Sequence, residues 1–361
     1  MEKNIVEIPK NYYTNRLEKI RSILDKQGVD CLLIYNAEKE DPAFLPWILG
    51  ENVFDSTYLL VTKKDAFIFI PQWFTEEAKN LFKNIPAEII GTPEKAVMMP
   101  SIKTFVKDFE TIGYGGNAPY KELVLLAEKK LVNMEEDIRK IYETKDEIEI
   151  EILREVCGYT RKYLESLGLK QFIGKTEQEI AEQIKQEIEK SGYNLGHLSI
   201  VSGQRLQKTT AGFPTDYKIQ KDDVVCIDLG LEKQTYFSDI TRCYFLGDAE
   251  KKYRSNYNLL KNVVSNTSQI ITHGIKSKDI LNIIKNEFVR VGLSESSFVP
   301  SDLGHGIGTG RHEYPEVGFD ESVLEKGMVF TLEPEAKLPD GILVRHEDVF
   351  YINDEEKTLI L

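Results

Sequence analysis

The sequence is short of cysteine and of long apolar runs, and both shortages narrow its possible functions. Four cysteines occur in 361 residues, far apart and without a C-x-x-C pair, so we expect small core residues of a reduced, cytoplasmic protein. They are Cys31, Cys157, Cys226 and Cys243. The longest apolar runs, such as 31–35 and 66–70, have the length of a strand and are too short to span a bilayer.

Positive charge is also scarce. There are 46 lysines and arginines against 59 aspartates and glutamates, a formal net charge of -13. An acidic surface repels phosphate backbones and anionic lipids, so neither nucleic acid nor a membrane is expected as a partner. The first ten residues mix charges without an apolar segment, and no signal peptide is expected.

The length predicts two domains. In residues 1–138, helical spacings, among them 75–84, 94–110 and 120–131, alternate with short apolar runs. This pattern predicts a small α/β domain with a hairpin at 57–71 and no motif that suggests chemistry. Residues 141–361 are predicted to be α+β with antiparallel strands, after a charged linking stretch at 135–147. There we expect helices at 147–167, 176–191, 250–273 and 277–292, and strands at 198–202, 223–230, 235–246, 327–338 and 342–352.

The first strong signal is a predicted hairpin in residues 223–246. If Glu232 pairs with Thr235 across the turn, Asp228 lies directly opposite Asp239, because paired residue numbers in a hairpin have a constant sum. Cross-strand neighbours have Cβ atoms about 4.5–5.5 Å apart. The two aspartates would therefore share one face of the sheet.

A second hairpin, in residues 327–352, repeats the arrangement. Pro339-Asp-Gly341 is a good three-residue loop. Pairing Leu338 with Ile342 places Glu333 opposite Glu347. Two hairpins thus each predict a pair of like charges face to face.

Such pairs are destabilising unless they are exposed, share a proton or bind cations. Both pairs lie in strongly apolar strands, which weakens the exposed interpretation. Four carboxylates would balance two divalent ions. Oxygen-rich sites with an added imidazole suit manganese, cobalt, iron or zinc.

Histidine is the candidate imidazole, and there are five. His305 is favoured because Gly304 and Gly306 on either side would allow close approach of backbone and ligand. For each of the others a structural or surface role competes with ligation. They are His197, just before a predicted strand; His273, expected to end a helix; His312; and His346, expected to face away from Glu347.

These residues resemble the motifs of the M24 metallopeptidases, a family that includes Xaa-Pro dipeptidase (prolidase), aminopeptidase P and methionine aminopeptidase. The resemblance spans about 141–361, and the first domain resembles, less specifically, the creatinase-type domain of prolidases. The matching segments are Asp228-x-Gly230, Ser238-Asp239-x-Thr241-Arg242, Gly304-His305-Gly-Ile-Gly308 with His312-Glu313, Thr331-x-Glu333-Pro334 and Arg345-x-Glu347-Asp348.

The resemblance implies a pita-bread catalytic domain with two divalent ions, manganese foremost and cobalt, zinc or iron as alternatives. Asp228 would bind one ion, His305 and Glu333 the other, and Asp239 and Glu347 both. A hydroxide held between the ions would attack the amide bond before proline in a dipeptide or short peptide. A homodimer is also implied.

Further roles follow from the same resemblance. Glu333 would accept the proton of the attacking water, and His312 would hold the substrate carbonyl and stabilise the tetrahedral intermediate. Arg345 would orient Glu347 or a substrate carboxylate, or form a purely structural ion pair.

Two departures from the family leave other functions open. Ala211 occupies the place of a histidine that contacts the substrate, and His197, Lys208 or Thr209 could compensate as a substrate-side group. Glu335 stands where prolidases tend to have glycine. The alternatives are an enzyme acting on a non-peptide amide-like compound, or a non-catalytic domain that binds peptides.

Overall fold

The computed structural model describes residues 6–9, 11–35, 44–51, 57–93, 98–115, 120–168 and 171–361. The chain divides into a first unit, Glu7–Tyr142, and a second unit, Glu143–Leu361, to which Val6 also belongs. Among these residues, every helix is too short or too polar to cross a membrane.

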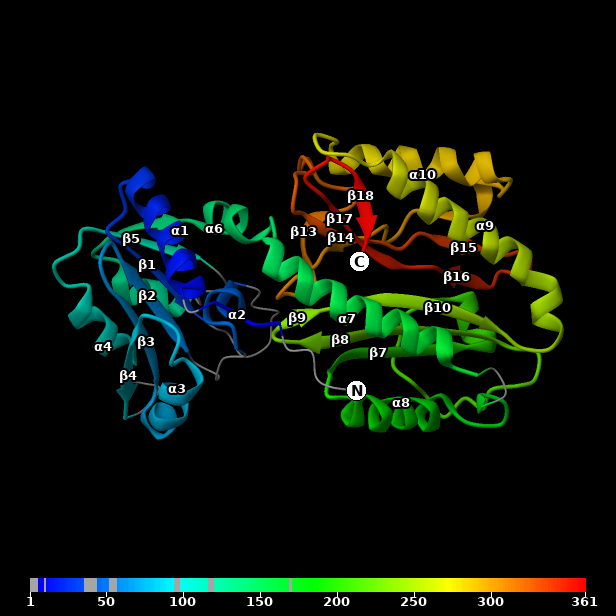
Figure 1. Cartoon of the computed structure of the whole chain (residues 1–361), viewed down its shortest axis with the longest axis horizontal. Coiled ribbons are helices and arrows are strands. Elements are labelled where there is room, and N and C mark those ends of the chain that lie inside the picture. Colours follow the sequence, from blue (N-terminus) through cyan, green and yellow to red (C-terminus); the bar gives the residue numbers. More distant parts are fainter. Residues whose placement is uncertain are drawn as a thin grey trace. The chain divides into compact units, whose positions relative to one another are not determined.

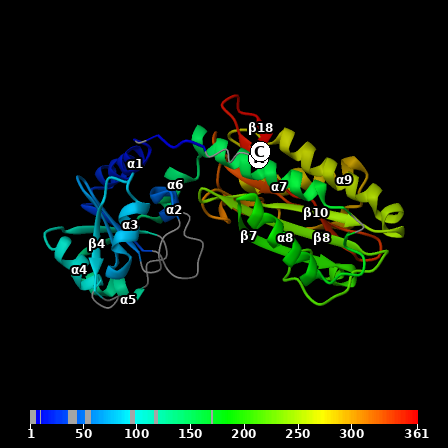
Figure 2. The same cartoon turned by 60° about the horizontal axis from the view of Figure 1, so that its bottom comes forward.

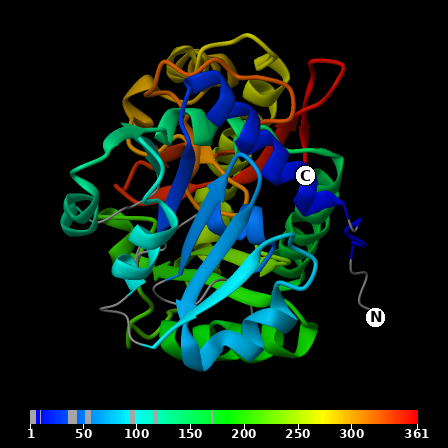
Figure 3. The same ribbon diagram turned by 90° about the vertical axis from the view of Figure 1, so that its left-hand side faces the viewer.

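The first unit is built on a mixed six-stranded sheet (Figures 1 and 3). Its strands in spatial order are β4 (Glu88–Thr92), β3 (Ala66–Pro71), β2 (Tyr58–Thr62), β1 (Cys31–Tyr35), β5 (Thr111–Gly115) and β6 (Lys130–Asn133). The predicted hairpin is confirmed, because Val61 pairs with Ala66 in an antiparallel ladder. The strands at both ends of the sheet pair in parallel.

Short helices connect these strands. They are α1 (Tyr12–Gln27), α2 (Phe44–Leu49), α3 (Thr75–Leu81), α4 (Met98–Phe105), α5 (Tyr120–Leu123) and α6 (Glu135–Tyr142). Two predicted helices are shorter than expected. The one at 94–110 covers only Met98–Phe105, its first four residues lying outside the described part, and the one at 120–131 ends early because Lys130–Asn133 pairs with β5. Strand pairing therefore overrides the local helical spacing.

The second unit has four long helices close to the predicted positions: α7 (Glu147–Ser166), α8 (Glu177–Ser191), α9 (Asp248–Ile270) and α10 (Ser277–Val291). A capping box begins α8, since the side chains of Thr176 and Glu179 each accept the other's backbone N–H. His273 lies beyond the last residue of α9, so the expectation that it ends that helix is wrong.

The strands of the second unit form three sheets. The first sheet contains β7 (Asn194–Ser202), β8 (Val224–Lys233), β9 (Tyr236–Phe237) and β10 (Ile240–Phe245). The second sheet contains β11 (Phe298–Val299), β15 (Glu335–Lys337) and β16 (Leu343–Arg345). The third sheet contains β12 (His305–Gly306), β13 (Glu313–Glu316), β14 (Val329–Leu332), β17 (Asp348–Ile352) and β18 (Thr358–Ile360). Each of the last two predicted strands is broken in two, at Glu333-Pro334 and at His346-Glu347. Proline has no N–H for a ladder, which explains the first break.

In the second unit, the strands β7, β8 and β10 lie between two layers of helices. Figure 1 shows β7, β8 and β10 between α8 and the pair α9 and α10, and Figure 2 shows these strands side by side. Along β8, Val224 and Cys226 join the apolar core that includes α9 and α10, whereas Val225 and Ile227 join the core that includes α7 and α8. Because side chains alternate along a strand, Asp228 points to the same face as Cys226.

Candidate metal centre

The first hairpin brings its two aspartates together in a register other than the predicted one. Asp228 pairs with Thr241, and the turn is Gln234-Thr235, both with positive φ (48° and 70°). The prediction that Asp228 lies directly opposite Asp239 is therefore wrong by two residues. A two-residue turn with positive φ usually contains Asn or Gly, so this sequence gave no signal for its position. Because side chains repeat every second residue, a shift of two keeps Asp239 on the same face.

The second hairpin has the predicted register. On either side of the two strand breaks, the pairs are Leu332 with Asp348, and Glu335 with Arg345. In both pairs the two residue numbers have the same sum as those of Leu338 and Ile342, the pair that was predicted from the loop. Glu333 and Glu347 lie at these breaks, where their side chains are buried.

The two hairpins and the His305 loop converge on one buried cluster. Three groups of possible ligands each have their ligand atoms within 4.8 Å of one another. These groups are His197, Asp228 and Asp239; Asp239, His305 and His312; and His305, Glu333 and Glu347. Because Asp239 and His305 each belong to two groups, the five predicted ligands form a continuous site, here called the carboxylate cluster.

His305 is oriented by its backbone surroundings. Its backbone N–H donates to Thr331 Oγ1 at 3.0 Å, and its ring Nδ1 lies 2.9 Å from the carbonyl of Gly306. Gly304 has φ of 140°, and any Cβ there would overlap the carbonyl of Thr331. Nε2 is thereby directed at Glu333 Oε1 and Asp239 Oδ2, 3.4 Å and 3.8 Å away.

The cluster holds more negative charge than the surrounding protein balances. Burial raises the pKa of Glu333 to about 7, and burial followed by repulsion from neighbouring carboxylates raises the pKa of Asp228 and Glu347. The pKa of Asp239 is lowered instead, because the nearby His197 outweighs the effect of burial. Asp239 Oδ1 is buried and accepts no hydrogen bond of good geometry from the described residues, although His197 Nε2 is 3.0 Å away. Carboxylate oxygens with an imidazole are suitable ligands for divalent transition ions, so the donor set fits such ions.

Arg345 is a buried arginine beside the carboxylate cluster, and its guanidinium pairs with two carboxylates. Its Nη1 lies 2.7 Å from Glu333 Oε2, and its Nη2 donates to Glu335 Oε1 at 3.0 Å. The hydroxyl of Thr210 donates to the same oxygen of Glu335. Of the roles predicted for Arg345, the structure shows the ion pair, and Glu335 is its second partner. Sequence reasoning singled out Glu335 without finding this contact.

His312 lies at the exposed side of the cluster. Its ring is 4.3 Å from that of His305 in an edge-to-face arrangement. The next residue, Glu313, is buried, pairs with Lys145 Nζ at 2.6 Å and accepts the N–H of Gly310. The loop that carries His312 is therefore fixed at its base by a buried ion pair. Sequence reasoning did not find the part played by Lys145, since it is 168 positions away from Glu313.

The remaining candidate histidines and Ala211 are placed as follows. His197 belongs to β7 rather than preceding it, and its Nε2 lies 2.7 Å from Asp228 Oδ1. His346 points away from the cluster toward Tyr257 and Asp348, and burial lowers its pKa to about 4. Ala211 is exposed, and its backbone bonds the hydroxyl of Thr209.

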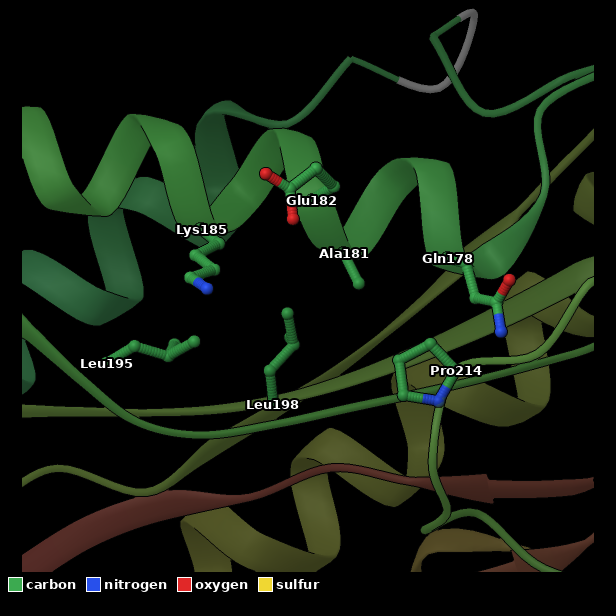
Figure 4. Close-up of a pocket in the computed structure, with 7 residues that line it drawn as sticks. All are labelled: Gln178, Ala181, Glu182, Lys185, Leu195, Leu198 and Pro214. Carbon is green, nitrogen blue, oxygen red and sulfur yellow. The ribbon is translucent and has the colours of Figure 1, made fainter.

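A pocket of about 430 Å³ lies elsewhere, between α8 and β7 (Figure 4). Gln178, Ala181, Glu182 and Lys185 line it from the helix, and Leu195, Leu198 and Pro214 from the opposite side. Leu198 alternates with the cluster-facing residue His197 along β7, so it points to the other face of the sheet. The pocket is therefore not part of the carboxylate cluster.

Comparisons with known proteins agree with this geometry. Residues 151–354 match metallopeptidase family M24, and residues 16–141 match the creatinase/prolidase N-terminal domain. A Xaa-Pro dipeptidase from Pyrococcus horikoshii is 29% identical over 344 residues, which cover 93% of this chain and 94% of that protein.

Two solved structures share the whole fold. The crystal structure of the prolidase from Pyrococcus horikoshii OT3 has a TM-score of 0.80 at 25% identity and covers 96% of this chain and 97% of its own. The X-Pro aminopeptidase from Thermotoga maritima MSB8 has a TM-score of 0.84 at 23% identity over 96% of each chain. The predicted α+β fold, a pita-bread catalytic domain after a creatinase-like domain, is confirmed. The chain belongs to metallopeptidase family M24 and is a peptidase that depends on divalent metal ions.

Proposed function

We propose that this peptidase holds two divalent ions in the carboxylate cluster and cleaves the bond before proline in a dipeptide or short peptide. The observation that carries the proposal is the convergence of five buried ligand side chains from two hairpins and a glycine-flanked loop. The Xaa-Pro dipeptidase that aligns with nearly the whole chain supports the substrate class.

In this proposal the ions are shared among the ligands as the resemblance implies. Asp228 would hold one ion, His305 and Glu333 would hold the other, and Asp239 and Glu347 would contact both. Manganese is the first expectation, with cobalt, zinc or iron as alternatives, because carboxylates dominate the donor set.

The bound ions would polarise the scissile carbonyl and lower the pKa of an attacking water. Glu333 is oriented for accepting the proton, since Arg345 holds one of its oxygens and the hydroxyl of Thr331 donates to the other at 3.1 Å. His312 is exposed beside His305 and would donate a hydrogen bond to the substrate carbonyl oxygen as negative charge develops there. Arg345 positions Glu333 rather than binding a substrate carboxylate, because both of its terminal nitrogens already face carboxylates.

A second candidate function is the hydrolysis of a non-peptide amide-like substrate, and Ala211 is the observation that favours it. A methyl group has no hydrogen-bond donor, and losing one such donor costs about 10²–10³ in rate. Both hydroxyls that precede Ala211 in the sequence have partners: that of Thr209 donates to the carbonyl of Ala211 itself, and that of Thr210 donates to Glu335.

A substrate panel tests the proposal. The protein, loaded in turn with manganese, cobalt or zinc, is assayed on Xaa-Pro dipeptides, Xaa-Pro tripeptides and matched Xaa-Ala peptides, beside an Ala211→His variant and an Ala211→Ser control. We expect turnover of the Xaa-Pro peptides and a gain in Ala211→His alone. Absence of turnover at every metal loading, in wild type and variant, would exclude the peptidase and favour the amide-like or binding function. A cytoplasmic homodimer without nucleic-acid or membrane partners stays a prediction.

A further inference from the structure

A histidine outside the predicted ligand set reaches the carboxylate cluster. His197 Nε2 lies 2.7 Å from Asp228 Oδ1 and 3.0 Å from Asp239 Oδ1, and these three residues alone form one of the groups that could hold an ion. Donor atoms bound to one ion at about 2.1 Å lie about 3 Å apart when they are at right angles. The separations of 2.7 Å and 3.0 Å in the structure are therefore close to those expected for ligands of a shared ion.

The backbone of β7 is shaped to place this ring. The ladder between β7 and β8 is in register at Leu195 with Leu231 and shifts by one residue at His197 with Gly230. Gly196 is the extra residue of this bulge. A bulge changes the direction of the side chains that follow it and is common beside active sites. On the other side of His197 the ladder is regular and Ser199 lies opposite Asp228, so alternation along β7 turns the imidazole to the face that carries Asp228.

Gly230 provides the space that the ring fills. A Cβ at this position would overlap Nδ1 and Cε1 of His197. The glycine of the Asp228-x-Gly230 motif therefore leaves room for the imidazole. It is not required by a turn, because its φ is not in the left-handed region. Nδ1 is buried and has no hydrogen-bond partner within the described residues, so Nε2 carries the polar contacts of the ring.

We propose that His197 is a protein ligand of the ion held by Asp228, so that each of the two ions has one imidazole ligand. This inference rests on the proposed two-ion site, and it replaces the expected substrate-side role of His197. Added to Asp228 and Asp239, the imidazole makes the first ion's ligands two carboxylates and one nitrogen. His305 is the nitrogen ligand of the second ion.

With His197 as a ligand, the ion site at Asp228 should prefer ions that bind nitrogen more strongly than a site made of carboxylates alone would. Imidazole suits zinc, cobalt and iron, whereas carboxylates alone suit manganese and magnesium. Removal of His197 is therefore expected to weaken zinc and cobalt binding at one site by at least about 10–100-fold, the range seen when groups supporting metal ligands are removed. Manganese binding should fall less.

X-ray absorption of the zinc-loaded or cobalt-loaded full chain tests ligation without measuring catalysis. We expect the average number of imidazole ligands to be two for every two bound ions in the wild type. In His197→Ala we expect one imidazole ligand for every two bound ions. His197→Gln retains a hydrogen-bond donor for Asp228 but has no imidazole, so it should resemble His197→Ala. His273→Ala, which removes an exposed imidazole past the end of α9, is the matched control and should resemble the wild type.

Calorimetric titration of the metal-free proteins with zinc gives the second measurement. One of the two binding events should weaken in both His197 variants, and thermal unfolding of the metal-free proteins shows whether each variant is folded. Equal imidazole counts in wild type and His197→Ala would overturn the proposal. So would tighter binding in His197→Ala, because His197 would then be a competing cation, or recovery in His197→Gln, because its role would then be hydrogen bonding. A wild type with two imidazoles but no Xaa-Pro turnover would contradict the proposed function and leave the ligation standing.

Discussion

Among the described residues, the first unit buries no carboxylate, and its buried polar groups are Arg16 and three threonines, whereas the second unit buries many aspartates and glutamates. Two sets of these carboxylates differ in their partners. One set is matched by lysine or arginine: Glu313 pairs with Lys145, and Asp348 with Arg161 and Arg242. The other set is the carboxylate cluster.

Within the cluster this matching is incomplete, because Glu333 alone has an arginine partner among the described residues. Asp228 and Asp239 have only histidines as ionic partners in the part of the chain that is described, and Glu347 accepts a hydrogen bond from the hydroxyl of Thr241 at 2.6 Å. Arg345 serves Glu333 and Glu335. The comparison shows that this fold compensates buried charge with its own cations except where external cations are expected to bind.

Breaking a matched pair should have the largest effect on stability. Lys145→Met leaves Glu313 buried without its cation, and the metal-free protein should lose about 3–5 kcal/mol of unfolding free energy in urea titration. The double variant Lys145→Met with Glu313→Gln is the control and should recover most of the loss. A loss below about 1 kcal/mol in the single variant would show that the pair is not needed where it is buried.

Neutralising a cluster carboxylate should have the opposite effect on stability. Glu347→Gln should reduce peptidase turnover by about 10²–10³ or more, while leaving the metal-free protein as stable as the wild type or more stable, because a buried negative charge is removed. Steady-state kinetics and urea unfolding measure the two effects. A strong destabilisation without metal would mean that Glu347 has a structural role like that of Glu313.

The smallest effect is expected in the first unit, at a partly exposed carboxylate. Asp30 Oδ2 accepts the N–H groups of Glu110 and Thr111, both at 2.9 Å, and these bonds, that of Thr111 first, lower its pKa. A lowered folded-state pKa means that its stabilisation is present above the ordinary pKa of about 3.9 and is lost as the pH falls through the folded value. Asp30→Asn should cost less than about 1 kcal/mol at pH 7, since solvent screens the charge.

The pH dependence of that cost is the measurement. Urea unfolding of wild type and Asp30→Asn at pH 7 and at pH 3 should give a difference that shrinks at the lower pH. A constant difference would attribute the cost to geometry instead of charge.

The sequence was sufficient for the parts of the site that depend on local pattern. The loop Pro339-Asp-Gly341 determines the register of the second hairpin, and the glycines beside His305 indicated a close backbone approach that the structure shows. The first register was mispredicted because Gln234 and Thr235 adopt positive φ without the residues that usually signal it. An error of two residues left the predicted face unchanged, so the two aspartates still meet.

Long-range contacts were beyond reach of the sequence pattern. Nothing near His197 indicates that β7 pairs with β8 so that its ring faces Asp228, and Lys145 is not linked to Glu313 by any local motif. Similarly, the short strand β6 was predicted as the end of a helix because its pairing with β5 is tertiary. Such features require knowledge of which strands are neighbours.

The most direct test of the central claim, that the unmatched carboxylates hold divalent ions, is a metal count. The purified protein, incubated with manganese and freed of unbound ions by dialysis, should contain about two ions per chain by plasma mass spectrometry. Glu347→Gln, measured beside it, should contain fewer. A count near zero in the wild type would contradict the claim and would leave the carboxylate cluster without the cations that its burial requires.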